Sequence, residues 1–255
     1  MAEAAPADLL RVEGRVACVT GASSGLGRRA AEVLARAGAS VVAVARRAEM
    51  LTEVCADAGG TLAAVQGDVA DRDGMDNLVA RIASKFGPPD IVVHAAGLNT
   101  REAADVVTAE GWDATLAVNL TAPFFLSQKL VPEMQRKGWG RIVNFASLQS
   151  FRAFPGGLAY GASKGGVAQL TRAMAQAWSG SGINTNALAP GFFETELTAA
   201  VFADKERAAR NAAQTCIGRN GEPADLDGPL LFLCSDASRY VTGQVLMLDG
   251  GYTAK

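Results

Sequence analysis

The sequence has few of the residues that mark disulfide-stabilised, metal-binding or nucleic-acid-binding proteins. It contains one histidine, and its four cysteines are scattered without the spacing of a metal or redox site. We therefore expect no metal site and reduced thiols, which suit a cytoplasmic protein. With 24 basic and 26 acidic residues the net charge is −2, and no basic stripe occurs. This balance argues against nucleic acid as a partner.

Long apolar runs and a targeting segment are missing as well. The first ten residues, MAEAAPADLL, include acidic residues and lack the basic and apolar blocks of a signal peptide. No apolar run approaches the roughly 20 residues that a membrane-spanning helix needs. We expect a cytoplasmic protein that has no membrane partner.

What the sequence does contain is an alternation of short β-branched runs with longer segments rich in alanine and leucine. The runs predict strands at 16–20, 40–45, 61–66, 90–97, 141–146, 183–191 and 244–251. The longer segments predict helices at 28–37, from Asp71 as N-cap, at 109–136 with a break at Pro123, at 159–178 and at 225–234.

These strands are apolar throughout, which is typical of a parallel sheet that helices cover on both faces. We predict an α/β fold of Rossmann type, with one doubly wound parallel sheet of about seven strands. No linker divides the chain, so we expect residues 1–255 to form a single domain with a mobile lid at about 192–217. Ligands of such sheets bind at the C-terminal ends of the strands.

A glycine-rich turn, TGASSGLG at 20–27, joins the first predicted strand to the first helix. Gly21 would allow a tight exit from the strand, Gly25 would let the backbone approach a pyrophosphate, and Gly27 would let the helix pack closely on the sheet. The helix N-terminus would offer N–H groups and a positive dipole to that anion. No Lys-Ser or Lys-Thr pair follows, which excludes a P-loop. A simple helix cap is the structural alternative.

The second predicted strand ends in Ala45-Arg46-Arg47, without the acidic residue that binds the ribose 2′-hydroxyl in NAD-dependent enzymes. A guanidinium can bind a 2′-phosphate through two hydrogen bonds. Arg46 is therefore our candidate for selecting NADP(H), with NADPH preferred over NADH, and a solvated surface arginine is the alternative. Asp68, after the third strand, would accept a hydrogen bond from the adenine amino group or serve only as a turn residue.

Tyr160 and Lys164 lie four residues apart in AYGASK, so they share one face of a predicted helix. A nearby ammonium stabilises a phenolate, so we expect Lys164 to lower the pKa of Tyr160, and a cationic nicotinamide to lower it further. The pair could then exchange protons near neutral pH. By itself, a Tyr-x-x-x-Lys pair is common on protein surfaces.

Two more polar residues are predicted to lie at the same edge of the sheet. Ser147 follows the fifth strand and could donate a hydrogen bond to a substrate carbonyl oxygen. Asn119, in the long helical segment, could bind a water that passes protons on towards Lys164. A helix cap for Ser147 and a packing amide for Asn119 are the structural alternatives.

In order and spacing these motifs resemble those of the short-chain dehydrogenase/reductases. The resemblance covers the chain from about Val12 to Tyr252. It rests on TGASSGLG, Asp68, HAAG at 94–97, Asn119, Ser147 with YGASK, and PGFFET at 190–195. Within the family the chain is most similar to the 3-oxoacyl-carrier-protein reductase and gluconate 5-dehydrogenase branches.

The resemblance implies that Ser147 orients the carbonyl, Tyr160 is the general acid in reduction, Lys164 holds the nicotinamide ribose, and Asn119 maintains a water relay. It also implies a homotetramer with the Asn119 and Tyr160 helices at one interface. Together, the resemblance and the motifs assign an NADP cofactor to Gly21, Ser23, Ser24, Gly25, Leu26, Gly27, Arg46, Asp68, Val69, Ala96, Gly97, Tyr160, Lys164, Pro190, Gly191 and Thr195.

The chain departs from the family pattern at two places. Where the family usually has Asn-Asn-Ala-Gly, this chain has His94-Ala95-Ala96-Gly97. Ala95 cannot make the hydrogen bonds of an amide, so another group must satisfy the neighbouring backbone. We interpret His94 as structural, because its place matches a cofactor-side position. The second departure is Asn184-Thr185 in the sixth strand, for which the sequence offers no physical account.

Apolar side chains dominate the two loops that would border the substrate, namely Leu148, Phe151, Phe154, Phe192 and Phe193. Such a pocket favours an apolar or aromatic ketone over a heavily hydroxylated sugar, unless several of the rings pack beneath the lid. No basic cluster marks a phosphopantetheine site, although Arg101, Lys129 and Arg152 could contribute to one.

We therefore expect a single dinucleotide-binding and catalytic domain that reduces a small-molecule ketone to a secondary alcohol with NADPH, Tyr160 acting as general acid. Two enzyme alternatives are a polyol or secondary-alcohol dehydrogenase, such as gluconate 5-dehydrogenase, and a 3-oxoacyl-carrier-protein reductase. A binding protein that senses NADP is the non-enzyme alternative. The intact set of four polar residues opposes the last one, because a sensor has no need of all four.

Overall fold

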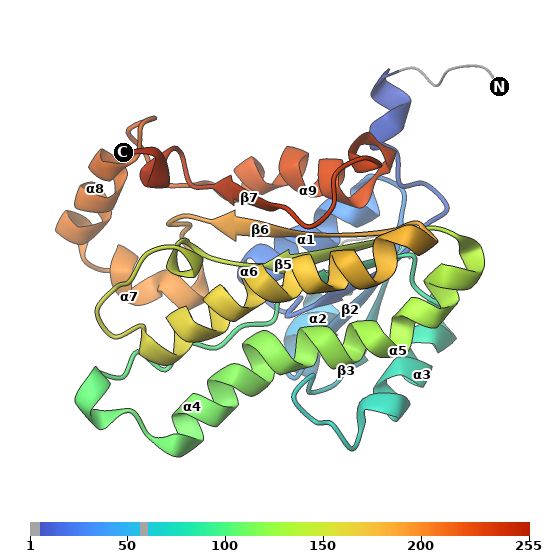
Figure 1. Cartoon of the computed structure of the whole chain (residues 1–255), viewed down its shortest axis with the longest axis horizontal. Helices are drawn as coiled ribbons and strands as arrows, with labels where there is room; N and C mark the ends of the chain where they lie inside the picture. Colours follow the sequence, from blue (N-terminus) through green and yellow to red (C-terminus); the bar gives the residue numbers. More distant parts are fainter. Residues whose placement is uncertain (1–5, 57–60) are drawn as a thin grey trace.

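The computed structural model describes residues 6–56 and 61–255, and its centre is a parallel sheet of seven strands in the order β3-β2-β1-β4-β5-β6-β7 (Figure 1). After β3 the chain returns to the middle of the sheet and continues in the opposite direction, so the fold is doubly wound as predicted. The strands are β1 (Val16–Thr20), β2 (Ser40–Ala45), β3 (Leu62–Gln66), β4 (Ile91–His94), β5 (Gly140–Phe145), β6 (Ile183–Pro190) and β7 (Val245–Leu248).

Helices cover both faces of the sheet. One apolar cluster joins the sheet to α1, α2 and α9, and a second joins it to α3, α5 and α6, which Figure 1 shows on the opposite side. The helices are α1 (Gly25–Arg36), α2 (Ala48–Ala56), α3 (Met75–Phe86), α4 (Ala109–Leu116), α5 (Ala122–Lys137), α6 (Leu158–Trp178), α7 (Ala199–Phe202), α8 (Lys205–Gln214) and α9 (Asp227–Cys234).

Successive residues of a strand contribute to opposite clusters. In β2, Val41 and Ala43 belong to the cluster with α1, whereas Val42 and Val44 belong to the cluster with α5, and all four side chains are fully buried. Because both faces are covered, both sets of positions must be apolar. This explains why the sequence shows continuous apolar runs where a half-exposed strand would alternate.

Two helix predictions were wrong in detail. Asp71 does not cap α3, because its Oδ1 accepts a hydrogen bond from the Gly74 backbone N–H at 3.0 Å in a turn that precedes the helix. The break in the long helical segment lies upstream of Pro123, in a π-helical turn (Ala117–Thr121) whose Ala122 N–H donates to the Ala117 carbonyl. Pro123 instead lies in the first turn of α5, where a missing N–H is tolerated.

The unusual Asn184 of β6 has a structural explanation. Its Nδ2 donates to the carbonyl oxygens of Ser238 and Arg239 at 3.0 and 3.1 Å, and the side chain is buried. These bonds tie β6 to the connection that leads into the edge strand β7. An amide suits this place because one nitrogen can donate to two carbonyl groups.

The predicted lid consists of short elements. After β6 come a 3₁₀ turn (Glu196–Thr198), then α7 and α8, which Figure 1 shows at the end of the molecule near the C-terminus. The Phe193 side chain at its start is buried and packs against Gly221. Within the part of the chain that the structure describes, no helix is both long and apolar enough to span a bilayer.

Candidate active site

The glycine-rich turn after β1 lies against the loop that follows β4. Gly21 has a φ of 69°, which favours glycine, and a side-chain carbon there would lie 2.6 Å from Cα of Ala96. A side-chain carbon at Gly27 would lie 2.3 Å from the Gly21 carbonyl oxygen. Neither position has room for a side chain, so the turn packs closely against α1 and against the loop after β4. The N-terminus of α1, which begins at Gly25, could hold the pyrophosphate of a dinucleotide through its backbone N–H groups.

The residues predicted to contact the adenosine lie near the ends of β2 and β3. Arg46 is exposed, and its carbonyl oxygen accepts a hydrogen bond from Gln66 Nε2 at 3.0 Å. Asp68 is exposed and accepts from the Ala70 backbone N–H at 2.9 Å, so it serves as a turn residue here. Val69 is buried beside it. The selection of NADP(H) by Arg46 and the adenine contact of Asp68 stay predictions.

Arg47, the neighbour of Arg46, contacts the glycine-rich turn directly. Its Nη2 donates to Oγ of Ser23 at 3.1 Å and to Oγ of Ser24 at 3.0 Å. It also forms an ion pair with Glu196 of the lid at 2.7 Å. Nothing in the local sequence pattern distinguishes Arg47 from the adjacent Arg46, so its contacts could not be predicted.

Of the residues predicted to hold the nicotinamide, Thr195 lies against the glycine-rich turn, and Pro190 and Gly191 lie beside β7. A side-chain carbon at Gly25 would lie 3.2 Å from Cβ of Thr195, so the start of the lid touches the turn. Pro190 ends β6, and the Gly191 N–H donates to the Leu248 carbonyl at 2.8 Å. Gly97 faces Asn119, whose Oδ1 would lie 3.7 Å from a side-chain carbon there.

Ser147 and Tyr160 come from different elements and meet through their hydroxyl groups. Ser147 follows β5 and caps a 3₁₀ turn (Leu148–Ser150), where its Oγ accepts from the Gln149 N–H at 3.2 Å. Tyr160 lies in the first turn of α6 and is half-buried. A hydrogen bond with Ser147 acts to lower the pKa of Tyr160. Because Ser147 Oγ already accepts one bond, its own proton is available to the phenolic oxygen.

Lys164 is buried one helical turn after Tyr160. Its Nζ donates to the carbonyl oxygen of Phe145, the last residue of β5, at 2.6 Å. Burial lowers the pKa of Lys164 to about 8. The Lys164 side chain therefore ties α6 to the end of β5.

The expectation that Lys164 lowers the pKa of Tyr160 stays a prediction. Burial raises the pKa of Tyr160, and the opposing effects come from the hydrogen bond with Ser147 and from the positive charge of Arg101. Lys164 Nζ lies 5.5 Å from the centroid of the tyrosine ring and donates to the Phe145 carbonyl. The structure thus adds a serine and an arginine to the groups that act on the tyrosine.

Both polar atoms of the Asn119 side chain form hydrogen bonds with other residues of the protein. Its Oδ1 accepts from the Leu98 N–H and its Nδ2 donates to the Leu98 carbonyl, both at 2.8 Å, while Nδ2 also donates to Ser163 Oγ at 2.9 Å. Ser163 in turn donates to the Tyr160 carbonyl at 2.7 Å. The π-helical turn therefore presents an amide that fixes both the loop after β4 and the first turn of α6. A water relay through Asn119 stays a prediction.

Comparisons with known proteins agree with this arrangement. Residues 21–253 match the family described as enoyl-(acyl carrier protein) reductase. The chain is 41% identical over 249 residues to the gluconate 5-dehydrogenase of Gluconobacter oxydans, covering 96% of this chain and 97% of that one. It is 38% identical over 247 residues to the 3-oxoacyl-(acyl-carrier-protein) reductase of Thermotoga maritima, covering 95% and 99%.

Among solved structures, that of a gluconate 5-dehydrogenase from Burkholderia cenocepacia in complex with NADP and tartrate superposes with a TM-score of 0.92. The two sequences are 36% identical over 97% of this chain and 98% of that one. The chain belongs to the short-chain dehydrogenase/reductase family. It is therefore an oxidoreductase that acts on CH–OH and C=O groups, and the non-enzyme alternative is wrong.

In this short-chain dehydrogenase/reductase, His94 is a buried structural residue. Its Nε2 lies 2.8 Å from Ser127 Oγ of α5, and burial lowers its pKa to about 3, so the ring is neutral. Thr20 satisfies the backbone next to Ala95, because its Oγ1 accepts a hydrogen bond from the Ala96 N–H at 3.3 Å. Hydrogen bonds with Ser127 of α5 and Thr20 of β1 are thus present at the two places where the family asparagines are missing.

The side chains expected to border the substrate separate into two groups. Leu148 and Phe193 are buried, and Phe151 is exposed. Phe154 and Phe192 pack with Tyr252 of the C-terminal segment, with ring centroids 5.6 to 6.3 Å apart. This three-ring cluster joins the loop after β5, the start of the lid and the C-terminus. The contact with Tyr252 could not be seen in the sequence because its partners lie 60 to 98 positions away.

Arg101 is the residue whose importance the sequence understated. It has a φ of 57°, and among the described residues it is the one non-glycine with a positive φ. Its Nη2 donates to the Leu197 carbonyl of the lid at 2.7 Å, and its charge acts on Tyr160. The other two basic candidates lie elsewhere, since Lys129 pairs with Asp76 and Arg152 donates to the Lys255 carbonyl.

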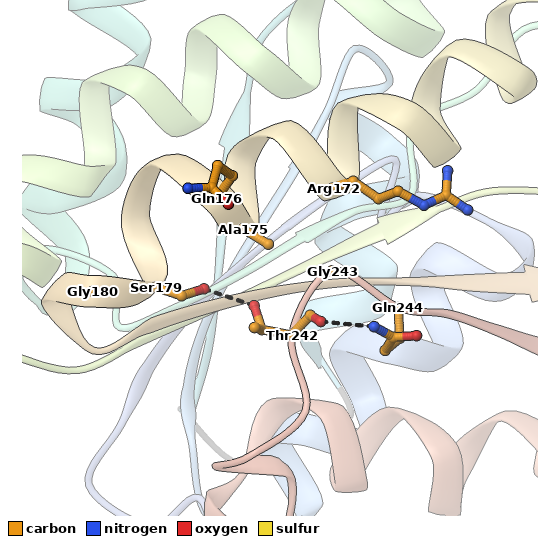
Figure 2. A pocket seen from close by; sticks show the side chains of 8 residues that line it. All are labelled: Arg172, Ala175, Gln176, Ser179, Gly180, Thr242, Gly243 and Gln244. Carbon is orange, nitrogen blue, oxygen red and sulfur yellow. Dashed lines mark hydrogen bonds between the residues drawn. The ribbon is translucent and has the colours of Figure 1, made fainter.

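A surface hollow lies between the C-terminal half of α6 and the connection from β6 to β7 (Figure 2). Ser179 Oγ and Thr242 Oγ1 are 2.7 Å apart there, and Gln244 Nε2 donates to the Thr242 carbonyl at 3.0 Å. The predicted catalytic and cofactor-binding residues do not line this hollow. Ligands of doubly wound sheets bind at the C-terminal ends of the strands, so this hollow lies away from the predicted active site.

The buried His94 predicts a pH dependence of stability. The folded protein holds this ring neutral down to about pH 3, whereas in the unfolded chain it takes up a proton near pH 6.5. The free energy of unfolding should therefore fall as the pH decreases from 6.5 to 4.5, with a slope of up to ~1.4 kcal/mol per pH unit. His94→Gln should lose this slope in denaturant titrations. Equal slopes for both proteins would contradict a buried neutral histidine.

Proposed function

We propose that this enzyme is an NADPH-dependent reductase that converts a ketone bearing a carboxylate into the corresponding hydroxy acid, with Tyr160 as the general acid. The observation that supports the proposal is that Ser147, which follows β5, and Tyr160, in the first turn of α6, are close enough for a side-chain hydrogen bond that acts to lower the pKa of Tyr160. A carbonyl oxygen between two such hydroxyl groups could accept from both of them at once.

The residues of the chain divide the reaction between them. Ser147 donates a hydrogen bond that orients the carbonyl oxygen, and Tyr160 transfers its phenolic proton to that oxygen as negative charge develops. Asn119 and Ser163 hold the first turn of α6 through the Tyr160 carbonyl, which fixes the phenol in position. A bound nicotinamide cofactor would supply the hydride that reduces the carbonyl carbon. In the reverse direction the same phenol accepts the proton of the alcohol.

The cofactor would lie along the glycine-rich turn. The N-terminus of α1 would hold the pyrophosphate, Thr195 and the backbone after Pro190 would hold the nicotinamide, and Lys164 would hold its ribose. No acidic residue follows β2, where Arg46 and Arg47 stand instead. The solved Burkholderia relative contains NADP, which supports the same choice here.

The substrate class follows from Arg101. This exposed guanidinium is close enough to Tyr160 to act on its pKa, and its bond to Leu197 uses one of the five N–H donors of an arginine. Guanidinium groups bind carboxylates through paired hydrogen bonds. Gluconate and tartrate, named for two relatives, are both hydroxy carboxylates. An oxo acid would therefore place its carboxylate at Arg101 and its carbonyl at Ser147 and Tyr160.

We propose further that the enzyme is a homotetramer, as its family resemblance implies. The edge strand β7 exposes Leu246, and Tyr240 before it is fully exposed, which suits contact with a second copy. Multi-angle light scattering should give a mass about four times the 26.3 kDa of one chain. Leu246→Arg should reduce that mass, and a monomeric wild-type protein would contradict the proposal.

Replacing the proton donor tests the mechanism. Tyr160→Phe keeps the ring but removes the proton, so kcat for ketone reduction should fall at least a thousandfold, whereas the dissociation constant for NADPH should change less than about threefold. Cofactor oxidation and the quenching of cofactor fluorescence measure the two quantities. Turnover retained in the variant would remove Tyr160 from the proposed role.

Replacing Arg101 tests the substrate class. Arg101→Gln should raise KM for an oxo acid by about tenfold or more, because a charge-assisted hydrogen bond is lost. KM for a neutral ketone of similar size, such as the methyl ester of that acid, should not change. Arg152→Gln, which removes an arginine that binds the Lys255 carbonyl and does not act on Tyr160, is the matched control. If wild type prefers neutral aryl ketones over every oxo acid, the apolar pocket expected from the sequence is correct and the carboxylate site is not.

A further inference from the structure

Arg47 and Glu196 connect two segments that are far apart in the sequence, the end of β2 and the start of the lid. Arg47 Nη1 donates to Glu196 Oε1 at 2.7 Å and Nη2 donates to Oε2 at 2.8 Å, so the ion pair is bidentate. Ser24 Oγ donates to the same carboxylate at 2.8 Å. The carboxylate of Glu196 is thus bound by two guanidinium nitrogens and one hydroxyl group beside the glycine-rich turn.

These donors form a site for an oxyanion. Arg47 also donates to Ser23 and Ser24, which fixes its guanidinium against the turn. The hydrogen bonds from Arg47 and Ser24 lower the pKa of Glu196 to about 2, which shows how strongly the site favours a negative charge. A planar guanidinium with a neighbouring hydroxyl binds a phosphate with the same hydrogen bonds.

The position of the site indicates which phosphate it would bind. The residues after the second strand of a doubly wound sheet contact the ribose 2′ position of a dinucleotide. Arg47 is the second residue after β2, and Ser24 belongs to the turn that would hold the pyrophosphate. NADP differs from NAD by a phosphate at this 2′ position, so a site here distinguishes the two cofactors.

We propose that the carboxylate of Glu196 competes with the 2′-phosphate of NADP(H) for Arg47 and Ser24. The inference rests on the proposed NADP(H) dependence and adds a residue that opposes it. Glu196 lies next to Thr195, which touches Gly25, so the competing group sits on the lid. Binding of the phosphate would release Glu196 from the turn, and its return would assist release of the cofactor.

The strengths of the two interactions allow such an exchange. The side chains of Arg47 and Glu196 are 45% and 59% exposed, so water and salt screen their ion pair. A phosphate carries up to two negative charges and three acceptor oxygens. The 2′-phosphate should therefore displace the Glu196 carboxylate. The competition should weaken the binding of NADP(H).

Measured dissociation constants for NADPH and NADH test the competition. Glu196→Gln removes the charge, so its dissociation constant for NADPH should fall by roughly two- to fivefold, the range expected for an exposed ion pair, while that for NADH should not fall. Glu194→Gln, two residues away on the same exposed segment, is the matched control and should leave both constants unchanged. Weaker or unchanged NADPH binding by Glu196→Gln would overturn the proposal.

The arginine variant identifies the phosphate. Arg47→Ala should weaken NADPH binding by at least about tenfold and NADH binding by less than twofold, as expected for a lost charge-assisted contact. Glu196→Gln should then have no effect in the Arg47→Ala background, since it acts through that arginine. Equal weakening of NADPH and NADH would place the pyrophosphate at Arg47 and contradict a 2′-phosphate site. A wild-type protein that binds NADH more tightly than NADPH would instead refute the proposed cofactor, whatever the variants do.

Discussion

The interaction between the side chains of Ser147 and Tyr160 is the contact on which the proposed chemistry of this enzyme depends. Each residue reaches it from a separate element, Ser147 from the end of β5 and Tyr160 from the first turn of α6. Lys164 fastens the same helix to β5 through the Phe145 carbonyl, and Ser150 Oγ donates to the Lys164 carbonyl at 2.7 Å. These hydrogen bonds fix α6 relative to β5 at the place where the proton transfer from Tyr160 is proposed.

Charge around this contact is arranged by long-range packing. Burial alone would make the phenol of Tyr160 a poor acid, and the structure offsets this with a serine hydroxyl and with the Arg101 guanidinium. Arg101 adopts an uncommon left-handed backbone conformation, supported by a hydrogen bond from its N–H to Asn99 Oδ1 at 3.1 Å. Arg47 binds the lid through Glu196. Two arginines on two loops, Arg101 and Arg47, thus contact the start of the lid.

Much of the fold could be predicted from the sequence because the determining signals are local. Buried parallel strands need apolar residues at every position, and β2 shows this as an uninterrupted run from Val41 to Ala45. The glycine-rich turn was equally legible, since Gly21 and Gly27 have no room for a side chain. Asp71 does not cap α3, because its carboxylate accepts a hydrogen bond from the Gly74 N–H in a local turn.

The features that escaped prediction depend on contacts between distant segments. The sequence placed Lys164 beside Tyr160 by helical spacing, but could not show that its ammonium is directed to Phe145. It could not show that Arg47 binds the lid, because its partner Glu196 lies 149 positions away. It suggested an amide at Asn119 without the π-helical turn that presents it. Side-chain direction, once set by tertiary packing, decides each of these roles.

Spectrophotometric titration of the tyrosines tests the central contact most directly. The chain has three tyrosines, and comparison with Tyr160→Phe identifies the ionisation step of Tyr160. If the Ser147 hydroxyl donates to the phenolic oxygen, then Ser147→Ala should move that step to higher pH, because the bond that stabilises the phenolate is lost. A step that stays in place or moves to lower pH in Ser147→Ala would contradict the account.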